Sequence, residues 1–281
     1  MLTASRLNPM EAAGALMVLT LAIVAIAAPI LAPHDPIRAV AGTFGDPGAP
    51  SWAFPLGTDQ LGRDVLSRII FGARISLTVG IAAMLVTMAI GVTIGLLSGF
   101  FGGAVDFVLM RFTDVMLTLP ALLLAMAFVA VLRPSLLSIL IVIGLVSWTG
   151  VARVVRAETL SMAQRDFVMA ARALGAPSRR LIARHVLPNV LPIIVVMAVL
   201  GTSGTLLLDA GLSFLNLGVP PPTPSWGRMI EEATTYFRTA PWLAIFPGLA
   251  IFYAALGFNL LGYGYLRRRG RDTNTPAGGT S

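Results

Sequence analysis

Long runs of apolar residues dominate the chain. A helix needs about 20 largely apolar residues to cross the roughly 30 Å hydrocarbon layer of a bilayer. Six stretches meet this length, at residues 12–32, 75–99, 106–132, 135–155, 188–208 and 241–266. Each is expected to be a helix, because a segment in lipid must satisfy its backbone hydrogen bonds internally. Pro120 lies inside the third stretch and predicts a kink there. The pattern predicts an all-α, polytopic membrane protein with six transmembrane helices.

Composition narrows the chemistry open to such a protein. Only 12% of the 281 residues are charged, against about 25% in an ordinary soluble domain. The chain has no cysteine, which excludes disulfides and thiolate metal sites. All 20 basic residues are arginine, so a phosphate-binding loop with its required lysine is excluded. His34 and His185 are expected on opposite sides of the membrane and cannot share a metal. We therefore predict no catalytic residue, no bound cofactor and no metal site.

Arginines are unevenly distributed among the loops. Residues 156–187 hold six arginines and two acidic residues, and the tail at 267–281 holds four and one. In contrast, residues 33–74 contain four of each sign and residues 212–238 contain two of each sign. Because cytoplasmic loops carry the excess of arginine, this pattern predicts cytoplasmic N- and C-termini. The net charge of +7 is then a topology signal, and we expect no nucleic-acid partner.

The end of the extracytoplasmic segment 33–74 has an amphipathic pattern. Apolar residues recur at helical spacing from Leu61 to Ile70, and Thr58 or Asp59 is placed to cap the start. The polar residues of the other face are Arg63, Asp64, Ser67 and Arg68. This predicts a short helix on the outer membrane surface, and a docking surface for an external partner is the alternative.

Three segments follow from these features. Residues 1–74 form an N-terminal span with its extracytoplasmic loop, and residues 75–266 form a core of five spans. A basic cytoplasmic tail occupies residues 267–281.

Small residues line one stripe of the second span. Gly91, Gly95 and Gly99 recur every four residues, which lets another helix approach closely. The partner helix can belong to this chain or to a second membrane subunit, and the spacing does not distinguish them.

The cytoplasmic segment at about 156–187 predicts two short helices outside the membrane. Residues 162–174 favour a helix, and Gly175 follows as the residue that ends it. Pro177 begins a second helix through about His185, and Pro188 begins the fifth span.

This segment resembles a known motif. Ala170-Ala171, then Gly175 after three residues, then His185-Val186-Leu187-Pro188 after nine more, is similar to the EAA loop of permeases of ATP-binding-cassette (ABC) importers. Residues 56–77 and 212–227 resemble motifs of the C-type subunit in the dipeptide, oligopeptide and nickel branch. There are two departures: Met169 stands where the general motif has glutamate, and His185 stands where it has isoleucine.

The resemblance implies a type I ABC importer permease fold (MetI-like) in a bacterial inner membrane. It implies three kinds of partner: a second, B-type permease subunit, two cytoplasmic ABC ATPases that use the ATP, and an extracytoplasmic substrate-binding protein. The apolar composition adds membrane lipid as a fourth partner. The substrate would be a dipeptide or oligopeptide, with glutathione or a nickel complex as alternatives. The expected ATPase-docking residues are Phe167, Met169, Ala170, Ala171, Arg172, Ala173, Leu174, Gly175 and Ala176.

Three charged residues near the spans are further candidates. Asp209, near the outer end of the fifth span, could face a substrate pathway or form local hydrogen bonds. Arg111 and Asp114 are three residues apart and could pair on one helical face. The rival function is an ion-coupled secondary transporter, which usually has more buried acidic residues or inverted repeats. A membrane enzyme would need a convergent set of reactive groups, which the sequence does not provide.

Overall fold

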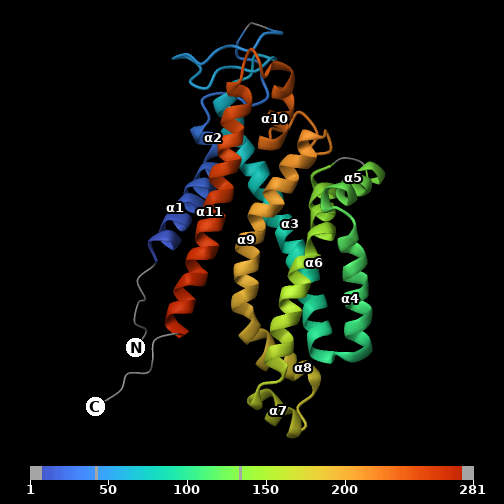
Figure 1. Cartoon of the computed structure of the whole chain (residues 1–281). Coiled ribbons are helices and arrows are strands. Elements are labelled where there is room, and N and C mark those ends of the chain that lie inside the picture. Colours follow the sequence, from blue (N-terminus) through green and yellow to red (C-terminus); the bar gives the residue numbers. More distant parts are fainter. Residues whose placement is uncertain (1–7, 42–43, 133–134, 274–281) are drawn as a thin grey trace, which may run out of the picture. The chain divides into compact units, whose positions relative to one another are not determined.

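The computed structural model of the protein describes residues 8–41, 44–132 and 135–273 (Figure 1). These residues form helices and no β-strand, which confirms the all-α prediction. The N-terminal half contains α1 (Pro9–Ile26), α2 (Ala28–Leu31), α3 (Val65–Phe101), α4 (Gly103–Thr118) and α5 (Ala121–Val131). The C-terminal half contains α6 (Leu136–Ala163), α7 (Asp166–Ala173), α8 (Ser178–Leu181), a π-helical turn (Ile182–Val186), α9 (Leu187–Phe214), α10 (Trp226–Ala233), a 3₁₀ turn (Thr234–Tyr236) and α11 (Trp242–Thr273).

Five helical segments in the described residues are long and apolar enough to cross a membrane. They are Pro9–Ile26, Val65–Phe101, Leu136–Ala163, Ser178–Phe214 and Trp242–Arg268. They correspond to five of the six predicted spans. The sixth, predicted at 106–132, is the pair α4 and α5, which meet at an angle of 89°.

The bend between α4 and α5 follows from Pro120. Proline disfavours helical geometry in the residue before it, and Leu119 is extended, with φ −94° and ψ 133°. The expected kink is therefore a complete break. Since α5 has only 11 residues, or about 17 Å of helix, it is too short to cross the bilayer alone.

The helix predicted on the outer surface at 61–70 is not a separate element. Its residues from Val65 onward form the first turns of α3, which continues for 37 residues. Asp64, rather than Thr58 or Asp59, caps the helix: its carboxylate accepts a hydrogen bond of 3.1 Å from the backbone N–H of Ser67. The polar face was expected at the surface, but Arg63, Asp64, Ser67 and Arg68 are all buried.

The helices divide into two compact units. The first contains α1, α2, α3 as far as Ile81, α9 from Val199, α10 and α11. The second contains α3 from Ala82, α4, α5, α6 from Leu137, α7, α8 and α9 as far as Ala198.

In the first unit, α1 lies along α11 (Figure 1). Glycines allow this close approach: a Cβ atom on Gly14 would lie 2.3 Å from the backbone nitrogen of Leu261, and one on Gly264 would lie 2.5 Å from that of Glu11. One end of the contact carries an ion pair of 3.1 Å between Glu11 and Arg268. The two backbones therefore touch where the side chains are smallest.

In the second unit, the glycine stripe of α3 packs against α6. A Cβ atom on Gly91, Gly95 or Gly99 would lie 2.7 Å from the Cβ atom of Val151, Val155 or Thr159, respectively. Both series advance by four residues, so the two helices remain in register over two turns. The stripe therefore serves packing inside this chain, which was one of the two alternatives left open by the sequence.

Charged residues join α4 to α6 in the same unit. The guanidinium of Arg156 donates two hydrogen bonds of 2.5 Å to the carboxylate of Asp106, which also accepts from the hydroxyl of Ser98. Arg153 forms an ion pair of 2.6 Å with Asp114. The predicted pairing of Asp114 with Arg111 is therefore wrong. The guanidinium of Arg111 instead lies 5.5 Å from the ring centroid of Phe107.

The glycine stripe generates a testable expectation. Gly95→Val should destabilise the chain by about 1–3 kcal/mol, because the added atoms would overlap Val155 and the carbonyl oxygen of Ala152. Thermal unfolding of the purified protein in detergent measures the effect. Gly150→Val is the matched control on α6, since a Cβ atom there meets nothing within 4 Å. Equal melting temperatures for the two variants would contradict this account of the packing.

Candidate functional site

The segment that resembles an EAA loop forms α7 and its flanking turns in the second unit. The helix was expected to start at Met162, but α6 continues through Ala163 and α7 starts at Asp166. The carbonyl of Arg165 accepts the first hydrogen bonds, from the backbone N–H groups of Val168 (2.9 Å) and Met169 (3.0 Å). Asp166 lies in the first turn and Arg172 in the last turn, and both charges interact favourably with the helix dipole.

Gly175 ends α7 as the sequence predicted. Its φ of +80° lies in the left-handed region, where a side chain would be strained. The backbone N–H of Gly175 donates to the carbonyl of Arg172 (3.0 Å), and that of Ala176 donates to the carbonyl of Ala171 (3.1 Å). This pair of bonds is a Schellman motif, which satisfies the last carbonyls of the helix.

The next helix begins at Ser178 and does not stop before Pro188. A π-helical turn at Ile182–Val186 connects α8 to α9, and the N–H of Leu187 donates to the carbonyl of Ile182, five residues back. Such a turn widens the helix just before Pro188, whose ring would otherwise crowd the backbone carbonyl four residues earlier. The predicted break at Pro188 is therefore replaced by a continuous helical segment from Ser178 to Phe214.

One face of α7 is anchored in an apolar cluster of the second unit. Val168 has no exposed surface and is the central contact of the helix. Ala171, one turn later, and Ala176 pack against the same cluster. Its buried members come from α3, α6, α7, α8, the π turn and α9: Met84, Met88, Leu96, Val151, Val155, Val168, Leu181, Val186 and Val190. The cluster therefore connects α7 with three long helices, α3, α6 and α9.

The opposite face of α7 is exposed and apolar. Phe167 is 47% exposed, Met169 is 49% exposed and Leu174 is 89% exposed. Ala170 and Ala173 lie between them and are also exposed. We call these five residues the α7 face. The ring of Phe167 lies 6.4 Å from that of His185, which packs against it from the π turn.

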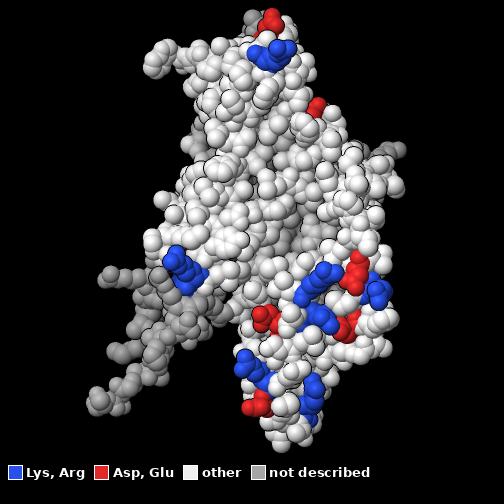
Figure 2. All heavy atoms as spheres, in the orientation of Figure 1, with Lys and Arg blue, Asp and Glu red and all other residues white. Residues whose placement is uncertain are grey.

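The structure separates the nine predicted docking residues into two groups. Five form the α7 face, whereas Ala171 and Ala176 pack inward and Gly175 forms the turn. Arg172 has a contact inside the chain, because its guanidinium lies 5.2 Å from the ring centroid of Phe100. Figure 2 shows charged groups gathered at the end of the second unit that carries α7 and α8.

Asp209 does not lie on an open surface. It belongs to the part of α9 in the first unit, and only 1% of its surface is exposed. Its Oδ1 atom has no hydrogen-bond partner among the described residues. In this conformation Asp209 is therefore not open to a pathway within the chain. The local hydrogen bond that the sequence suggested is not made by Oδ1.

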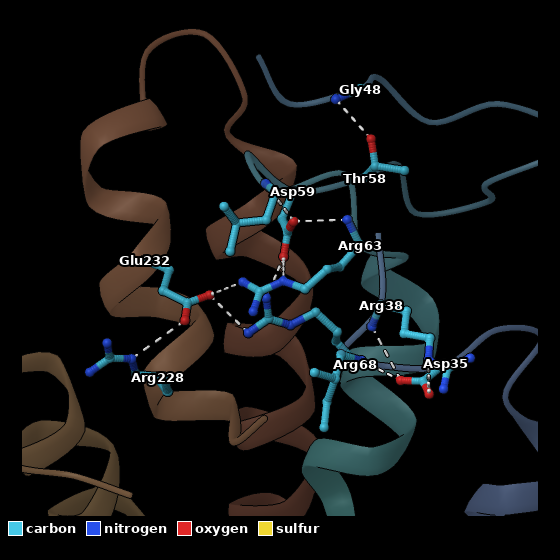
Figure 3. Close-up of polar contacts among 11 residues, drawn as sticks. Asp35, Arg38, Gly48, Thr58, Asp59, Arg63, Arg68, Arg228 and Glu232 are labelled. Carbon is cyan, nitrogen blue, oxygen red and sulfur yellow. Dashed lines mark hydrogen bonds and ion pairs between the residues drawn. The ribbon is translucent and has the colours of Figure 1, made fainter. Parts of the chain in front are cut away.

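A cluster of buried charges in the first unit was not foreseen. The side chains of Asp59 and Glu232 both point toward the guanidinium groups of Arg63 and Arg68 (Figure 3). One carboxylate oxygen of Asp59 accepts from Arg63 (2.7 Å) and from Arg68, and one oxygen of Glu232 accepts from Arg63 (2.9 Å) and Arg68 (2.8 Å). Burial raises the pKa of Asp59, and the charge of Arg68 opposes that shift.

We call these four residues the outer ion cluster, because the sequence predicts that residues 33–74 lie on the outer side of the membrane, and they join the start of α3 to α10. Arg228 extends it, since its guanidinium donates to Glu232 (3.4 Å) and to the side-chain oxygen of Asn216 (3.0 Å). Arg63 and Glu232 are 169 residues apart in the chain, so no local spacing could indicate the contact. The one feature of the sequence that could have indicated a buried ion cluster is the alternation of acidic and basic residues at 59–68, just before an apolar span.

The described residues thus form several helices that are long and apolar enough to cross a membrane, and one short helix with an exposed apolar face. Residues 91–271 match the family described as "Binding-protein-dependent transport system inner membrane component". The chain belongs to this family, and it is a permease subunit of the ABC-importer type.

Curated relatives support this membership over most of the chain. A "Dipeptide transport system permease protein DppC" from Alkalihalophilus pseudofirmus is 39% identical over 262 residues, covering 92% of this chain and 84% of the relative. A "Di/tripeptide transport system permease protein DppC" from Pseudomonas aeruginosa is 42% identical over 257 residues, covering 89% and 84%. A "Glutathione transport system permease protein GsiD" from Pectobacterium atrosepticum is 42% identical over 252 residues, covering 90% and 83%.

The outer ion cluster predicts a large effect from loss of one acidic group. Glu232→Gln should destabilise the chain by about 3–5 kcal/mol, because Arg63 and Arg68 would share a single buried carboxylate. Thermal unfolding in detergent again provides the measurement. Asp46→Asn is the control, since Asp46 is exposed in the same outer segment, and it should change stability by less than about 0.5 kcal/mol. A similar small change for both variants would show that the cluster contributes little.

Proposed function

We propose that this chain forms half of a heteromeric translocation pathway and takes up mechanical work through the α7 face. Two cytoplasmic ABC ATPases would bind this face and its counterpart on a second, B-type permease subunit. An extracytoplasmic binding protein would deliver the substrate. ATP would be used by the ATPases and not by this chain.

The single observation that carries the docking assignment is the exposure of the α7 face. Three large apolar side chains are 47%, 49% and 89% exposed on one short helix outside the long apolar segments. Such a contiguous apolar surface is typical of an interaction site. A protein groove suits it better than lipid, because anionic lipid would account for the three arginines of the segment 178–185 but not for the glycine turn at Gly175. Met169 stands where the general motif has glutamate, so a possible ionic contact with the ATPase is lost and the contact here would be apolar.

The anchoring of α7 suggests how force would be transmitted. Movement of the ATPases would displace the helix from Phe167 to Leu174 as a rigid lever, because the Schellman turn ends it sharply and Val168 fixes its inner face. The displaced Val168 would press on the apolar cluster, which includes Val155 of α6, Val190 of α9 and Met88 of α3. Repeated displacement would rock these helices between outward-open and inward-open arrangements, which changes access without a covalent step.

The substrate proposed here is a dipeptide or oligopeptide. Relatives of 39% and 42% identity are named for dipeptide and di/tripeptide transport, and this chain covers 84% of each. The glutathione permease at 42% identity supports a related small peptide as the alternative, with a nickel complex as a further one. An ion-coupled secondary transporter is the rival function, and it differs in needing no ATPase.

Both termini are proposed to be cytoplasmic, in a bacterial inner membrane. The arginine excess at 156–187 and 267–281 supports this orientation through the positive-inside rule. The segment 33–74 and α10 then lie outside, where the binding protein approaches.

Disruption of the α7 face should uncouple the transporter. Leu174→Asp should weaken retention of the ATPases by about tenfold or more, because a desolvated apolar contact at the centre of an interface would be replaced by a charge. Co-purification of the ATPases and ATP-dependent peptide uptake by the reconstituted complex are the measurements. Both should fall together.

The matched control for that variant is Trp52→Asp. Trp52 is a fully exposed apolar residue in the extracytoplasmic segment, so its replacement should leave ATPase retention unchanged. Full retention and full uptake with Leu174→Asp would refute docking at this face. Uphill uptake by the purified chain without any ATPase would instead favour the secondary transporter.

Orientation can be tested directly because the chain has no native cysteine. In intact cells, a membrane-impermeant maleimide should label Trp52→Cys, and it should label Arg267→Cys, near the C-terminus and away from the α7 face, only after the membrane is opened. Both positions are exposed, so accessibility within the protein does not limit either reaction. The reverse pattern would invert the proposed topology.

A further inference from the structure

A groove of about 520 Å³ lies in the first unit, beside the outer turns of α3. Its walls come from three segments: the chain after α2, the first half of α3, and the turn before α10. Apolar surface is contributed by Ile37, Phe71, Ile75 and Pro224. The outer ion cluster is a separate feature, since none of its residues lines this groove.

Arg74 is the cationic group of the groove. It is exposed, and no hydrogen bond or ion pair involves its guanidinium among the residues that the structure describes. This distinguishes it from Arg63 and Arg68, which lie 11 and 6 residues earlier and are each paired with two carboxylates. A guanidinium presents a planar set of donors that matches the oxygens of a carboxylate or a phosphate.

Asp35, the acidic residue of the groove, does not neutralise Arg74. The backbone N–H of Ile37 donates to its carboxylate (2.8 Å), as does that of Arg38 (3.2 Å), and the guanidinium of Arg38 lies 3.6 Å away (Figure 3). The N–H of Ile37 is the main cause that holds the pKa of Asp35 below its ordinary value. Asp35 therefore stays ionised and paired with Arg38, and the groove retains the positive charge of Arg74.

The position of Arg74 in the sequence places it at the edge of the hydrocarbon layer. It is the last charged residue before an uninterrupted uncharged run from Ile75 to Val105. Arginines near the ends of membrane helices extend their head groups toward the interface, at the level of lipid phosphates. The groove therefore has a cation at phosphate level and apolar walls along the adjoining helix.

We propose that this groove binds a phospholipid of the leaflet on the side of residues 33–74, with Arg74 holding the phosphodiester. One acyl chain would lie against Phe71 and Ile75. Arg74 and the apolar walls together match a phospholipid. A free anion would not use the apolar walls, and a plain hydrocarbon chain would not use Arg74. The site goes beyond the proposed function, since it needs no ATPase, binding protein or transported substrate.

The experiment is a titration of the purified full chain in detergent, followed by native mass spectrometry. Three probes separate the possible ligand chemistries: dioleoyl phosphatidylglycerol, dioleoylglycerol without a phosphate, and glycerol 3-phosphate without acyl chains. Only the phospholipid should bind. Arg74→Gln should weaken its binding about fivefold, the effect of one arginine near a lipid surface.

Further variants separate charge from folding. Arg74→Lys should keep most of the affinity, and Thr78→Trp should lower it by filling the groove while leaving Arg74 in place. Arg238→Gln is the matched control, because Arg238 is an exposed arginine in the same unit that does not line the groove.

Four results would overturn the proposal. They are unchanged phospholipid binding by Arg74→Gln, equal binding of dioleoylglycerol, binding of glycerol 3-phosphate alone, and equal weakening by Arg238→Gln. A photo-crosslinking residue at position 78 in the assembled complex supplies an independent test. It should capture phospholipid, and capture of the external binding protein instead would show that the groove is a protein-docking surface.

Discussion

Close contact between helix backbones is the constraint on which the rest of this structure depends. In hydrocarbon, an apolar side chain gains little by leaving lipid for another helix, because both surroundings are equally apolar. Helices must instead approach closely enough for dispersion contacts, and this chain places glycine where they meet. Gly95 allows α3 to meet α6, and Gly14 allows α1 to meet α11. Once these backbones are close, the side chains at their ends have fixed neighbours.

The few charged residues use those fixed positions. The α3–α6 contact ends next to Arg156, which then reaches Asp106 of α4, and the α1–α11 contact ends at the pair Glu11 and Arg268. In the outer ion cluster, four charged groups are shared between α10 and the segment that enters α3. A chain with 12% charged residues thus uses many of them to join helices. Charged residues that stay exposed and unpaired are then candidates for contact with a ligand or a partner. Arg74 is one of these, and it lines the groove of the first unit.

The α7 region combines three local devices that make a short helix rigid. The Schellman turn at Gly175 ends the helix sharply, the π turn continues into α9 despite Pro188, and Val168 locks one face into the apolar cluster. These devices leave Phe167, Met169 and Leu174 outside, where packing within this chain does not cover them. In the proposed mechanism, the same rigidity makes α7 an efficient lever, because little displacement is lost to internal bending.

Periodicity and composition were sufficient to predict the all-helical class, the positions of the long apolar spans and the end of α7 at Gly175. These features depend on neighbours within a few residues: hydropathy along one helix, or a single φ angle that favours glycine. The nine docking positions were also chosen from a local motif, but the side of α7 that each one occupies depends on the cluster beneath it. Ala171 and Arg172 therefore turned out to have contacts inside the chain.

Where the sequence alone misled, the missing partner was distant. The polar face at Arg63 and Arg68 looked solvent-facing because Glu232 is more than 160 residues away, and Asp114 pairs with Arg153 rather than with nearby Arg111. By itself, then, the sequence determined which segments are helical and apolar, since those preferences are local. Only the tertiary structure decided which charges are buried, which glycines meet a helix of the same chain and that Arg74 lines a groove without a partner among the described residues, because each of these depends on what another helix brings within a few ångströms.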